Sequence, residues 1–447
     1  MAPIPKTPKP QNPKTPKPLK SLIILCELII IKMKSRNSPL NSSDGSQDTD
    51  TTLEKEPGHK VQVTWWDYLP YYNFVIPFIM LYVSWEYLNH NVFILIWFLY
   101  VVVPIVDVLL PLDNYNLSNE EVKAFEKDKR FFIPLYLYMV IDFGFYFWGI
   151  YLFATGSIDS LLDKIMFTVT VAHAGAIGMT IGHELLHRRE TIHKVAGTLF
   201  YSKVMYSHFF IEHTKGHHKN VATPMDPASA MQGESLYQFL PRSILGGYKS
   251  VWKYESQRLA RKPKPESAFS LNNRMISFSL AQLTYLSIIT YLFGYEVLIY
   301  AVTYAMLDVF FLETINYIEH YGLRRECDEN GVYEPVNIKH SWNAPQRYTN
   351  YLLFKLQRHS DHHANSYKPY QILNSFEDSP TLPNGYSASL LTSFVPSIWF
   401  KAIDPLVNAY NEDRELTKEE KETSKSTINA YLFTTGTIMT VVCYLLM

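Results

Sequence analysis

The stretch NVFILIWFLYVVVPIVDVLLPL (residues 91–112) is apolar except for an asparagine at its start and one aspartate, with two prolines in its second half. A helix of about 20 mostly apolar residues is long enough to cross the hydrocarbon core of a membrane. Runs of this kind occur in close pairs, which buried helices of a large soluble protein would not explain. The runs cover residues 68–88, 91–111, 131–154, 160–182, 275–293 and 296–316. The sequence therefore predicts an all-α integral membrane protein with a bundle of six transmembrane helices.

Lysine and arginine are unevenly distributed among the connections between these runs. The connections after the first, third and fifth runs (NH, TGSIDS and GYE) contain neither residue. Those after the second, fourth and sixth runs contain KAFEKDKR, HRRE and YGLRRE. The positive-inside rule assigns the basic set, and with it the amino terminus, to the cytoplasm. We expect the inner membrane in a bacterium, or the endoplasmic reticulum in a eukaryote.

Both ends of the chain differ from the central region of residues 65–410. Residues 1–64 begin with the basic, proline-rich PIPKTPKPQNPKTPKPLK, which favours an extended and largely disordered tail. Residues 411–447 begin with a polar linker and end in the uncharged INAYLFTTGTIMTVVCYLLM. This last segment just reaches spanning length. It is either a seventh span or an apolar helix that lies on the core.

Charge and cysteine content exclude several classes of partner and cofactor. The net charge of −1 gives no indication of a nucleic-acid partner. The three cysteines lie far apart in the sequence, so the chain has no iron–sulfur, rubredoxin-type or zinc-ribbon module. Any redox partner must therefore be a separate protein.

Nine of the 15 histidines fall in four short clusters, in the sequences HELLH, HTKGHH, NYIEH and HSDHH. All four clusters lie at or after the ends of even-numbered runs, which places them on the cytoplasmic side. Residues four apart share one face of an α-helix, so the first, second and fourth clusters should each aim two imidazoles at one point. The neighbouring histidines, His218 and His362, would then reach a second metal. The nine are His183, His187, His213, His217, His218, His320, His359, His362 and His363.

The number of histidines favours iron over zinc. Read alone, HELLH matches the H-E-x-x-H signature of zinc proteases, with Glu184 as general base. Catalytic zinc needs only three protein ligands, however, and a zinc protease would leave seven histidines without a role. A histidine-rich transporter would need polar residues across the membrane, whereas the clusters lie at one face. Two iron ions with four or five imidazole ligands each account for all nine.

Several polar residues beside the clusters are candidates to orient the ligand rings by hydrogen bonds. Each of the carboxylates lies next to a histidine cluster or follows one closely, and a histidine in HSWN is a weaker candidate. These residues are Glu184, Glu212, Asp226, Glu319, Asp361 and His340.

The motifs resemble those of the integral-membrane alkane 1-monooxygenases, a family within the membrane fatty acid desaturase and hydroxylase superfamily. The similar strings are GHELLHRRE (182–190), HFFIEHTKGHHKNVATPMDPASA (208–230), NYIEHYGLRR (316–325) and LQRHSDHHANSYKPYQIL (356–373). The resemblance covers residues 65–410, and it implies six transmembrane helices with a cytoplasmic, histidine-rich diiron domain.

The same resemblance implies an activity. Members of the family oxidise the terminal methyl group of medium- to long-chain n-alkanes to a primary alcohol with O2. Their electrons come from NAD(P)H through a reductase and rubredoxin, and the chain itself carries no haem and no flavin. By position, the family's metal ligands correspond to the nine histidines named above.

Two departures from the family pattern bear on these expectations. Leu186 stands where the family has glycine, which is expected to crowd the first histidine cluster. The two tails are also not typical. The alternative within the superfamily is a lipid or fatty acyl desaturase or hydroxylase with a similar diiron centre. Basic residues near the clusters could attract an acidic electron carrier or act only as topology signals; they are Lys215, Lys219, Arg324 and Arg325.

Overall fold

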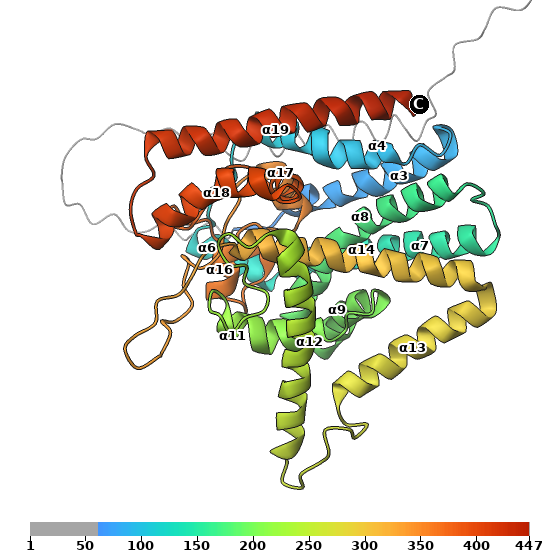
Figure 1. Cartoon of the computed structure of the whole chain (residues 1–447), viewed down its shortest axis with the longest axis horizontal. Helices are drawn as coiled ribbons and strands as arrows, with labels where there is room; N and C mark the ends of the chain where they lie inside the picture. Colours follow the sequence, from blue (N-terminus) through green and yellow to red (C-terminus); the bar gives the residue numbers. More distant parts are fainter. Residues whose placement is uncertain (1–60, 447) are drawn as a thin grey trace, which may run out of the picture.

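Three long helices form the centre of the molecule. The computed structural model describes residues 61–446, and within that range the regular elements are all helical. Helices α7 (Phe132–Ala154), α8 (Leu161–Leu186) and α14 (Tyr295–His320) run side by side through the middle of the fold (Figure 1). Helix α13 (Arg274–Phe293) leads into α14 through Gly294, whose φ of 89° allows the sharp reversal. The predicted tail lies outside the described residues except for its last four positions.

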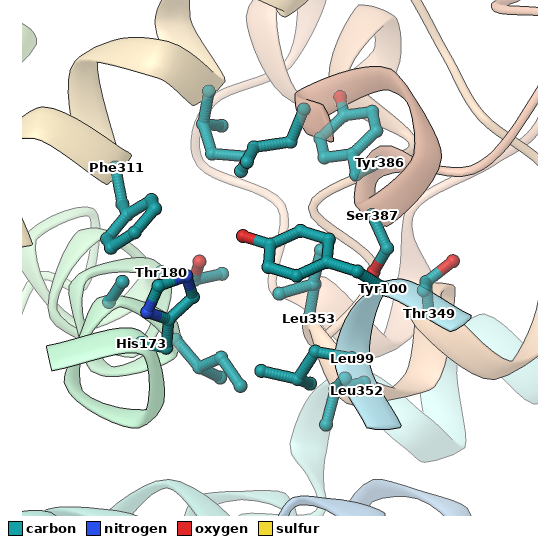
Figure 2. Close-up of a pocket in the computed structure, with 14 residues that line it drawn as sticks. Leu99, Tyr100, His173, Thr180, Phe311, Thr349, Leu352, Leu353, Tyr386 and Ser387 are labelled. Carbon is teal, nitrogen blue, oxygen red and sulfur yellow. The ribbon is translucent and has the colours of Figure 1, made fainter. Parts of the chain in front are cut away.

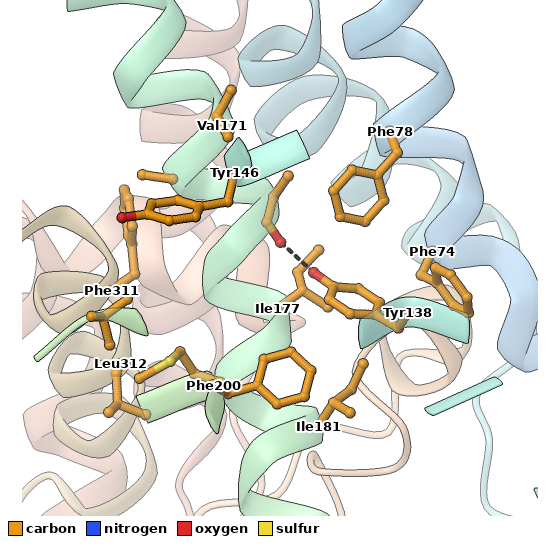
Figure 3. Close-up of a cluster of buried hydrophobic side chains, with 14 of the residues drawn as sticks. Phe74, Phe78, Tyr138, Tyr146, Val171, Ile177, Ile181, Phe200, Phe311 and Leu312 are labelled. Atoms are coloured by element: carbon orange, nitrogen blue, oxygen red, sulfur yellow. Dashed lines mark hydrogen bonds between the residues drawn. The ribbon is translucent and has the colours of Figure 1, made fainter. Parts of the chain in front are cut away.

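Small residues and tyrosines bring the central helices together. A Cβ added at Gly175 of α8 would lie only 1.9 Å from the hydroxyl oxygen of Tyr304 in α14, so the close approach of these helices requires glycine there. Tyr138 of α7 donates a hydrogen bond to the carbonyl of Ala174 (Figure 3). The surrounding core is rich in buried aromatic rings such as Phe200 and Phe74. This packing fixes the positions at which α8 and α14 end.

Five helices in the described part of the chain are long and apolar enough to cross a membrane. Helices α7, α8, α13 and α14 correspond to the third to sixth predicted runs. The fifth is the carboxyl-terminal helix α19 (Lys418–Leu445), which confirms that the apolar end of the chain is helical.

The first two predicted runs form shorter helices than expected. The first is divided into the 3₁₀ turn η1 (Leu69–Phe74), which has a proline in its first turn, and the 13-residue helix α3 (Val75–Tyr87). The second is helical only over residues 93–109, because the chain becomes extended at Leu110, directly before a proline. It consists of α4 (Phe93–Trp97), the π-helical turn η2 (Phe98–Val102) and α5 (Val103–Leu109). Of the six predicted runs, the first two therefore do not form single helices of spanning length.

Further helices, most of them shorter, lie around the carboxyl-terminal ends of α8 and α14 (Figure 1). Those between α8 and α13 are α9 (Thr191–Lys203), α10 (Phe209–Ile211), the π-helical turn η4 (Glu212–His217), α11 (His218–Asn220) and α12 (Leu236–Ala260). Those after α14 are α15 (Arg347–Leu352), α16 (His359–Ala364), η5 (Tyr370–Ile372), α17 (Tyr386–Ser393) and α18 (Pro396–Asn411). Those near the amino-terminal side are α2 (Trp65–Tyr68), α6 (Asn119–Lys127) and η3 (Lys129–Phe131).

Helix α19 lies along α4 and η2 at the edge of the fold (Figure 1). The indole Nε1 of Trp97 donates a hydrogen bond to Thr440 Oγ1 over 2.9 Å. Large apolar side chains of α19 remain exposed, among them Phe433 at 79%. The helix thus has the length that a seventh span requires. It also packs against the core, as the second alternative predicts.

Candidate metal centre

All nine predicted histidines lie together at the ends of α8 and α14. Their potential ligand atoms form two groups, and within each group these atoms lie within 4.8 Å of one another. The five-histidine group contains His183, His187, His213, His218 and His362. The four-histidine group contains His217, His320, His359 and His363.

The spacing of the ring nitrogens fits metal binding. In the five-histidine group, the Nε2 atom of His213 lies 3.1 Å from that of His187 and 3.0 Å from that of His218. In the four-histidine group, the Nε2 atom of His359 lies 3.2 Å from that of His320 and 3.0 Å from that of His363. Nitrogen ligands at about 2.1 Å from one ion, in neighbouring coordination positions, are themselves about 3 Å apart. Each group therefore has the geometry of rings that converge on a single ion.

Two further properties of the rings agree with metal binding. The Nε2 atoms of His183 and His217 are buried and have no hydrogen-bond partner among residues 61–446, which is costly for a polar atom unless something else binds it. Burial lowers the pKa of His187 to about 3, so its imidazole is neutral at physiological pH. A metal ligand needs this neutral form. The donor set thus fits soft-to-borderline first-row metals such as iron.

The turn that carries HTKGHH corrects one prediction. Residues Glu212–His217 form a π-helical turn rather than an α-helical one. A π-helix joins residues five apart, so His213 and His218 face the same group. His217 faces the other group. The predicted pairing of His213 with His217 is therefore wrong, because the prediction assumed α-helical spacing.

The other two predicted pairs agree with the structure. His183 and His187 lie one turn apart at the end of α8 and face the five-histidine group. His359 and His363 lie one turn apart in α16 and face the four-histidine group. His362, between them, points to the five-histidine group, as expected for a ring that reaches the second metal.

Asp226 orients one of the rings. Its Oδ2 atom lies 2.8 Å from Nδ1 of His217, on the opposite side of the ring from the free Nε2. Ser229 Oγ donates to the same carboxylate over 2.6 Å and holds it in place. Burial by itself would lower the pKa of His217, but the carboxylate of Asp226 raises it to about 9, so a metal ion that binds Nε2 would have to displace a proton from this ring. This is the arrangement expected of a partner that fixes the orientation of a ligand ring.

Glu319 and His340 also lie beside the four-histidine group. One carboxylate oxygen of Glu319 is 3.2 Å from Nε2 of His359, and the hydroxyl of Tyr386 hydrogen-bonds to this carboxylate. The side chain of His340 turns away to Glu334, and only its backbone carbonyl lies near the group, 3.4 Å from Nδ1 of His320. No sequence pattern indicated that Tyr386 belongs to the site, because it follows the last histidine cluster by more than 20 residues.

The remaining candidate carboxylates make no hydrogen bond to a histidine ring within the described residues. Glu184 pairs with Arg188 at 2.9 Å and accepts a bond from the backbone of Tyr370, so it does not take the position of a zinc-protease base. Asp361 pairs with Lys368 at 2.8 Å and holds the loop after α16. Glu212 packs beside the backbone of its own π-helical turn.

Leu186 does not point at the histidines. A Cβ added at Gly197 of α9 would lie 3.0 Å from side-chain atoms of Leu186 and 2.7 Å from the carbonyl oxygen of Gly182. The leucine therefore fills the interface between α8 and α9, and glycine at position 197 makes room for it. The expected crowding of the first cluster is absent, because the side chain packs against α9.

An apolar cavity lies near the metal centre, between η2, α8, α14, α15 and α17 (Figure 2). Thr180 lies one helical turn before His183, and Tyr386 contacts Glu319, so this end of the cavity adjoins both groups. His173 stacks against Phe311 in the cavity wall, with ring centroids 4.0 Å apart. The other lining residues are Leu99, Tyr100, Ala176, Ile177, Ile315, Thr349, Leu352, Leu353, Ser387 and Leu390.

Known proteins resemble this chain in sequence. Residues 164–388, which contain all nine histidines, match the family model described as "Fatty acid desaturase". The alkane 1-monooxygenase of Acinetobacter baylyi is 36% identical over 316 residues, which cover 70% of this chain and 77% of the relative. Alkane 1-monooxygenase 1 of Alcanivorax borkumensis is 37% identical over 314 residues, 70% of this chain and 76% of the relative. The chain belongs to the alkane 1-monooxygenase family.

Membership of the alkane 1-monooxygenase family establishes the class of this protein. The protein is an oxidoreductase with a non-haem metal site, embedded in a membrane by apolar helices. A more distant relative, the xylene/toluene monooxygenase hydroxylase component XylM of Pseudomonas putida, is 25% identical over 303 residues, 67% of this chain and 78% of the relative.

Proposed function

We propose that this chain hydroxylates the terminal methyl group of medium- to long-chain n-alkanes, with two non-haem irons bound by the nine histidines. The observation that carries the proposal is the position of the apolar cavity near the two histidine groups, with Thr180 in its wall three residues before His183. One oxygen atom of O2 enters a C–H bond to give the primary alcohol. The other leaves as water, with two electrons and two protons from outside the chain. Iron in both groups would supply the activation of O2 and the oxidation of the C–H bond.

The protein contributes positioning. An alkane has no polar handle, so only the shape and apolar lining of the cavity can hold it. Thr180 of α8 lies about one turn before His183, and Ile315 and Phe311 of α14 line the wall about one and a half and two and a half turns before His320. A chain that enters this cavity lengthwise presents its terminal methyl group to the metal centre, and such orientation lowers the barrier without acid–base chemistry.

The second contribution is rigidity at the metal centre. Every histidine in the four-histidine group is buried, and Asp226 fixes the ring of His217 from its Nδ1 side. Water is thereby kept from the rings, and the ligand nitrogens stay in place as electrons arrive.

Electrons must reach the centre from a separate carrier, for which we propose rubredoxin with its NAD(P)H reductase. Lys215 and Lys219 are exposed on the turns that carry HTKGHH. Arg324 is exposed nearby, and Arg325 joins the two regions by a hydrogen bond to the carbonyl of Lys219 over 3.0 Å. A basic surface directly over the ligands would attract an acidic carrier. The positive-inside rule puts this surface, and the metal centre, on the cytoplasmic side.

The test is hydroxylation of octane by the full-length protein in lipid nanodiscs with rubredoxin, its reductase, NADH and ¹⁸O2. The expected product is 1-octanol with one labelled oxygen, formed only when rubredoxin is present. The His217→Ala variant should give none. Iron-loaded protein that produces no octanol, while it desaturates an added fatty acyl substrate, would favour the alternative of a lipid desaturase, which the match to the fatty acid desaturase model keeps open.

A further inference from the structure

Tyr100 borders two separate spaces. On its inner side lies the cavity that adjoins the metal centre. On its outer side lies an open apolar groove between the second apolar segment and α19. The groove is lined from α5 by residues such as Pro104 and Val108, and from α19 by residues such as Gly436 and Thr437. Among the residues that line these two spaces, Tyr100 alone belongs to both.

The π-helical turn η2 places the tyrosine at this junction. Residues Phe98–Val102 depart from α-helical spacing, and such single π-turns often occur at functional positions. The ring of Tyr100 crosses the cavity in Figure 2, and its edge meets His173 at a centroid distance of 5.6 Å. Only 7% of Tyr100 is exposed, whereas its neighbour Val101 lines the groove. The side chain thus closes the cavity toward the groove.

Helix α19 forms the outer wall of the groove. Its position is fixed by the hydrogen bond from Trp97 to Thr440 and by a second one from Asn91 Nδ2 to the carbonyl of Cys443 over 3.4 Å. At Gly436 helix α19 lies close to η2, since a Cβ built there would be in van der Waals contact with Val101 at 3.7 Å. The groove opens outward beside exposed apolar side chains, of which Val108 is 81% accessible. Such a surface on a membrane helix faces lipid acyl chains.

We propose that the groove between α5 and α19 is the lateral entrance through which a linear hydrocarbon passes from the bilayer into the cavity, with the Tyr100 side chain as its gate. The identity of the occupant rests on the proposed function. An alkane partitions into the membrane interior, so an opening at acyl-chain depth receives it without exposure to water. Rotation of the Tyr100 ring from its present position would join the two spaces, and its return would close the cavity again.

The first test is a kinetic comparison of three full-length variants in nanodiscs. Gly436→Phe, or Thr437→Phe should the first fail to fold, places a ring in the groove. Ile438→Phe adds the same ring to α19 outside the groove and is the matched control. The groove variants are expected to lower kcat/KM for octane about tenfold, whereas kcat at saturating octane should not change. The reason is that the added ring slows entry of the substrate and leaves the reaction at the metal centre intact. The control should match the wild type.

The second test does not depend on turnover. A diazirine-bearing alkane is photolysed in nanodiscs that contain the protein, and the labelled residues are mapped by mass spectrometry. In the wild type and in Ile438→Phe, label is expected on Phe311 and Leu352 in the cavity as well as on the groove. In Gly436→Phe, cavity label should fall severalfold.

The outcomes separate the two proposals. Equal cavity label and equal kcat/KM in the groove variants and the control would overturn the lateral entrance even if octanol is formed. Cavity label that depends on the groove, without octanol from the iron-loaded wild type, would uphold the entrance and contradict the proposed reaction.

Discussion

The Nε2 atoms of His213 and His218 lie 3.0 Å apart although the two residues are five positions apart in the sequence. The π-helical turn between them makes this possible, and it sends His217 to the opposite group. One irregular turn of helix therefore supplies ligands to both candidate metal positions. A regular α-helix would have paired His213 with His217 instead.

The assignment of His213 and His218 to one group, and of His217 to the other, can be tested by metal content. The double variant His213→Ala/His218→Ala removes two ligands from one group and should retain about one iron per chain, in the intact four-histidine group. The variant His213→Ala/His217→Ala removes one ligand from each group and should weaken both positions. Elemental analysis with Mössbauer spectroscopy distinguishes the two patterns. The reverse pattern would show that the turn is α-helical when metal is bound.

Asp226 should determine metal affinity at the four-histidine group. Asp226→Asn removes the charge opposite His217 and is expected to weaken metal binding there about 10- to 100-fold, the usual cost of losing such a partner. Competition with a chelator measures the change. Glu329→Gln, at an exposed site, is the control and should have no effect. Unchanged affinity in Asp226→Asn would mean that the hydrogen bond is not needed to orient the ring.

Leu186 should contribute to stability and not to the metal centre. Leu186→Gly leaves a cavity against α9, which typically costs about 2–5 kcal/mol, and adds about 1 kcal/mol for glycine within a helix. We expect a clearly lower Tm in detergent with wild-type iron content. Loss of iron without a change in Tm would place the side chain against the rings after all.

Asp113 anchors the segment that carries the fourth histidine cluster. Its carboxylate is buried between Lys355 and Arg358, and Arg358 directly precedes His359. Burial alone would raise the pKa of Asp113, but the two cations hold it well below its usual value. Asp113→Asn leaves buried cations without a counter-charge and is expected to destabilise the fold by about 3–5 kcal/mol.

Thermal unfolding at neutral pH measures this effect, and an exposed ion pair provides the control. Asp413, paired with Lys339 at 2.7 Å, is largely exposed and screened by solvent, so Asp413→Asn should leave the Tm nearly unchanged. Equal shifts in Tm for the two variants would contradict the role of Asp113. Because its pKa is lowered on folding, the stabilisation by Asp113 is present at neutral pH and is lost as pH falls through that depressed value.

The sequence predicted what depends on composition and local spacing. Long apolar runs identified α7, α8, α13 and α14, and histidine clusters identified all nine rings that converge. It failed where the backbone departs from regular geometry. The π-turns at Phe98–Val102 and Glu212–His217 have no simple sequence signature; the first lies within the second predicted run, and the second changed the pairing of His213.

Residues that act through tertiary contacts were also beyond the sequence. Tyr386 reaches Glu319 only because α17 folds back over the end of α14. Leu186 was expected to crowd the rings, and only the position of Gly197 shows that it faces α9. Of the carboxylates beside the clusters, the sequence could not tell Asp226, which binds a ring, from Asp361, which binds a lysine.

The central claim is that the two histidine groups bind two irons. The most direct measurement is the metal content of the full-length, detergent-purified protein by inductively coupled plasma mass spectrometry. The account predicts about two irons per chain, one for each group of imidazoles. About one zinc per chain with negligible iron would contradict it, because catalytic zinc needs only three of the nine rings.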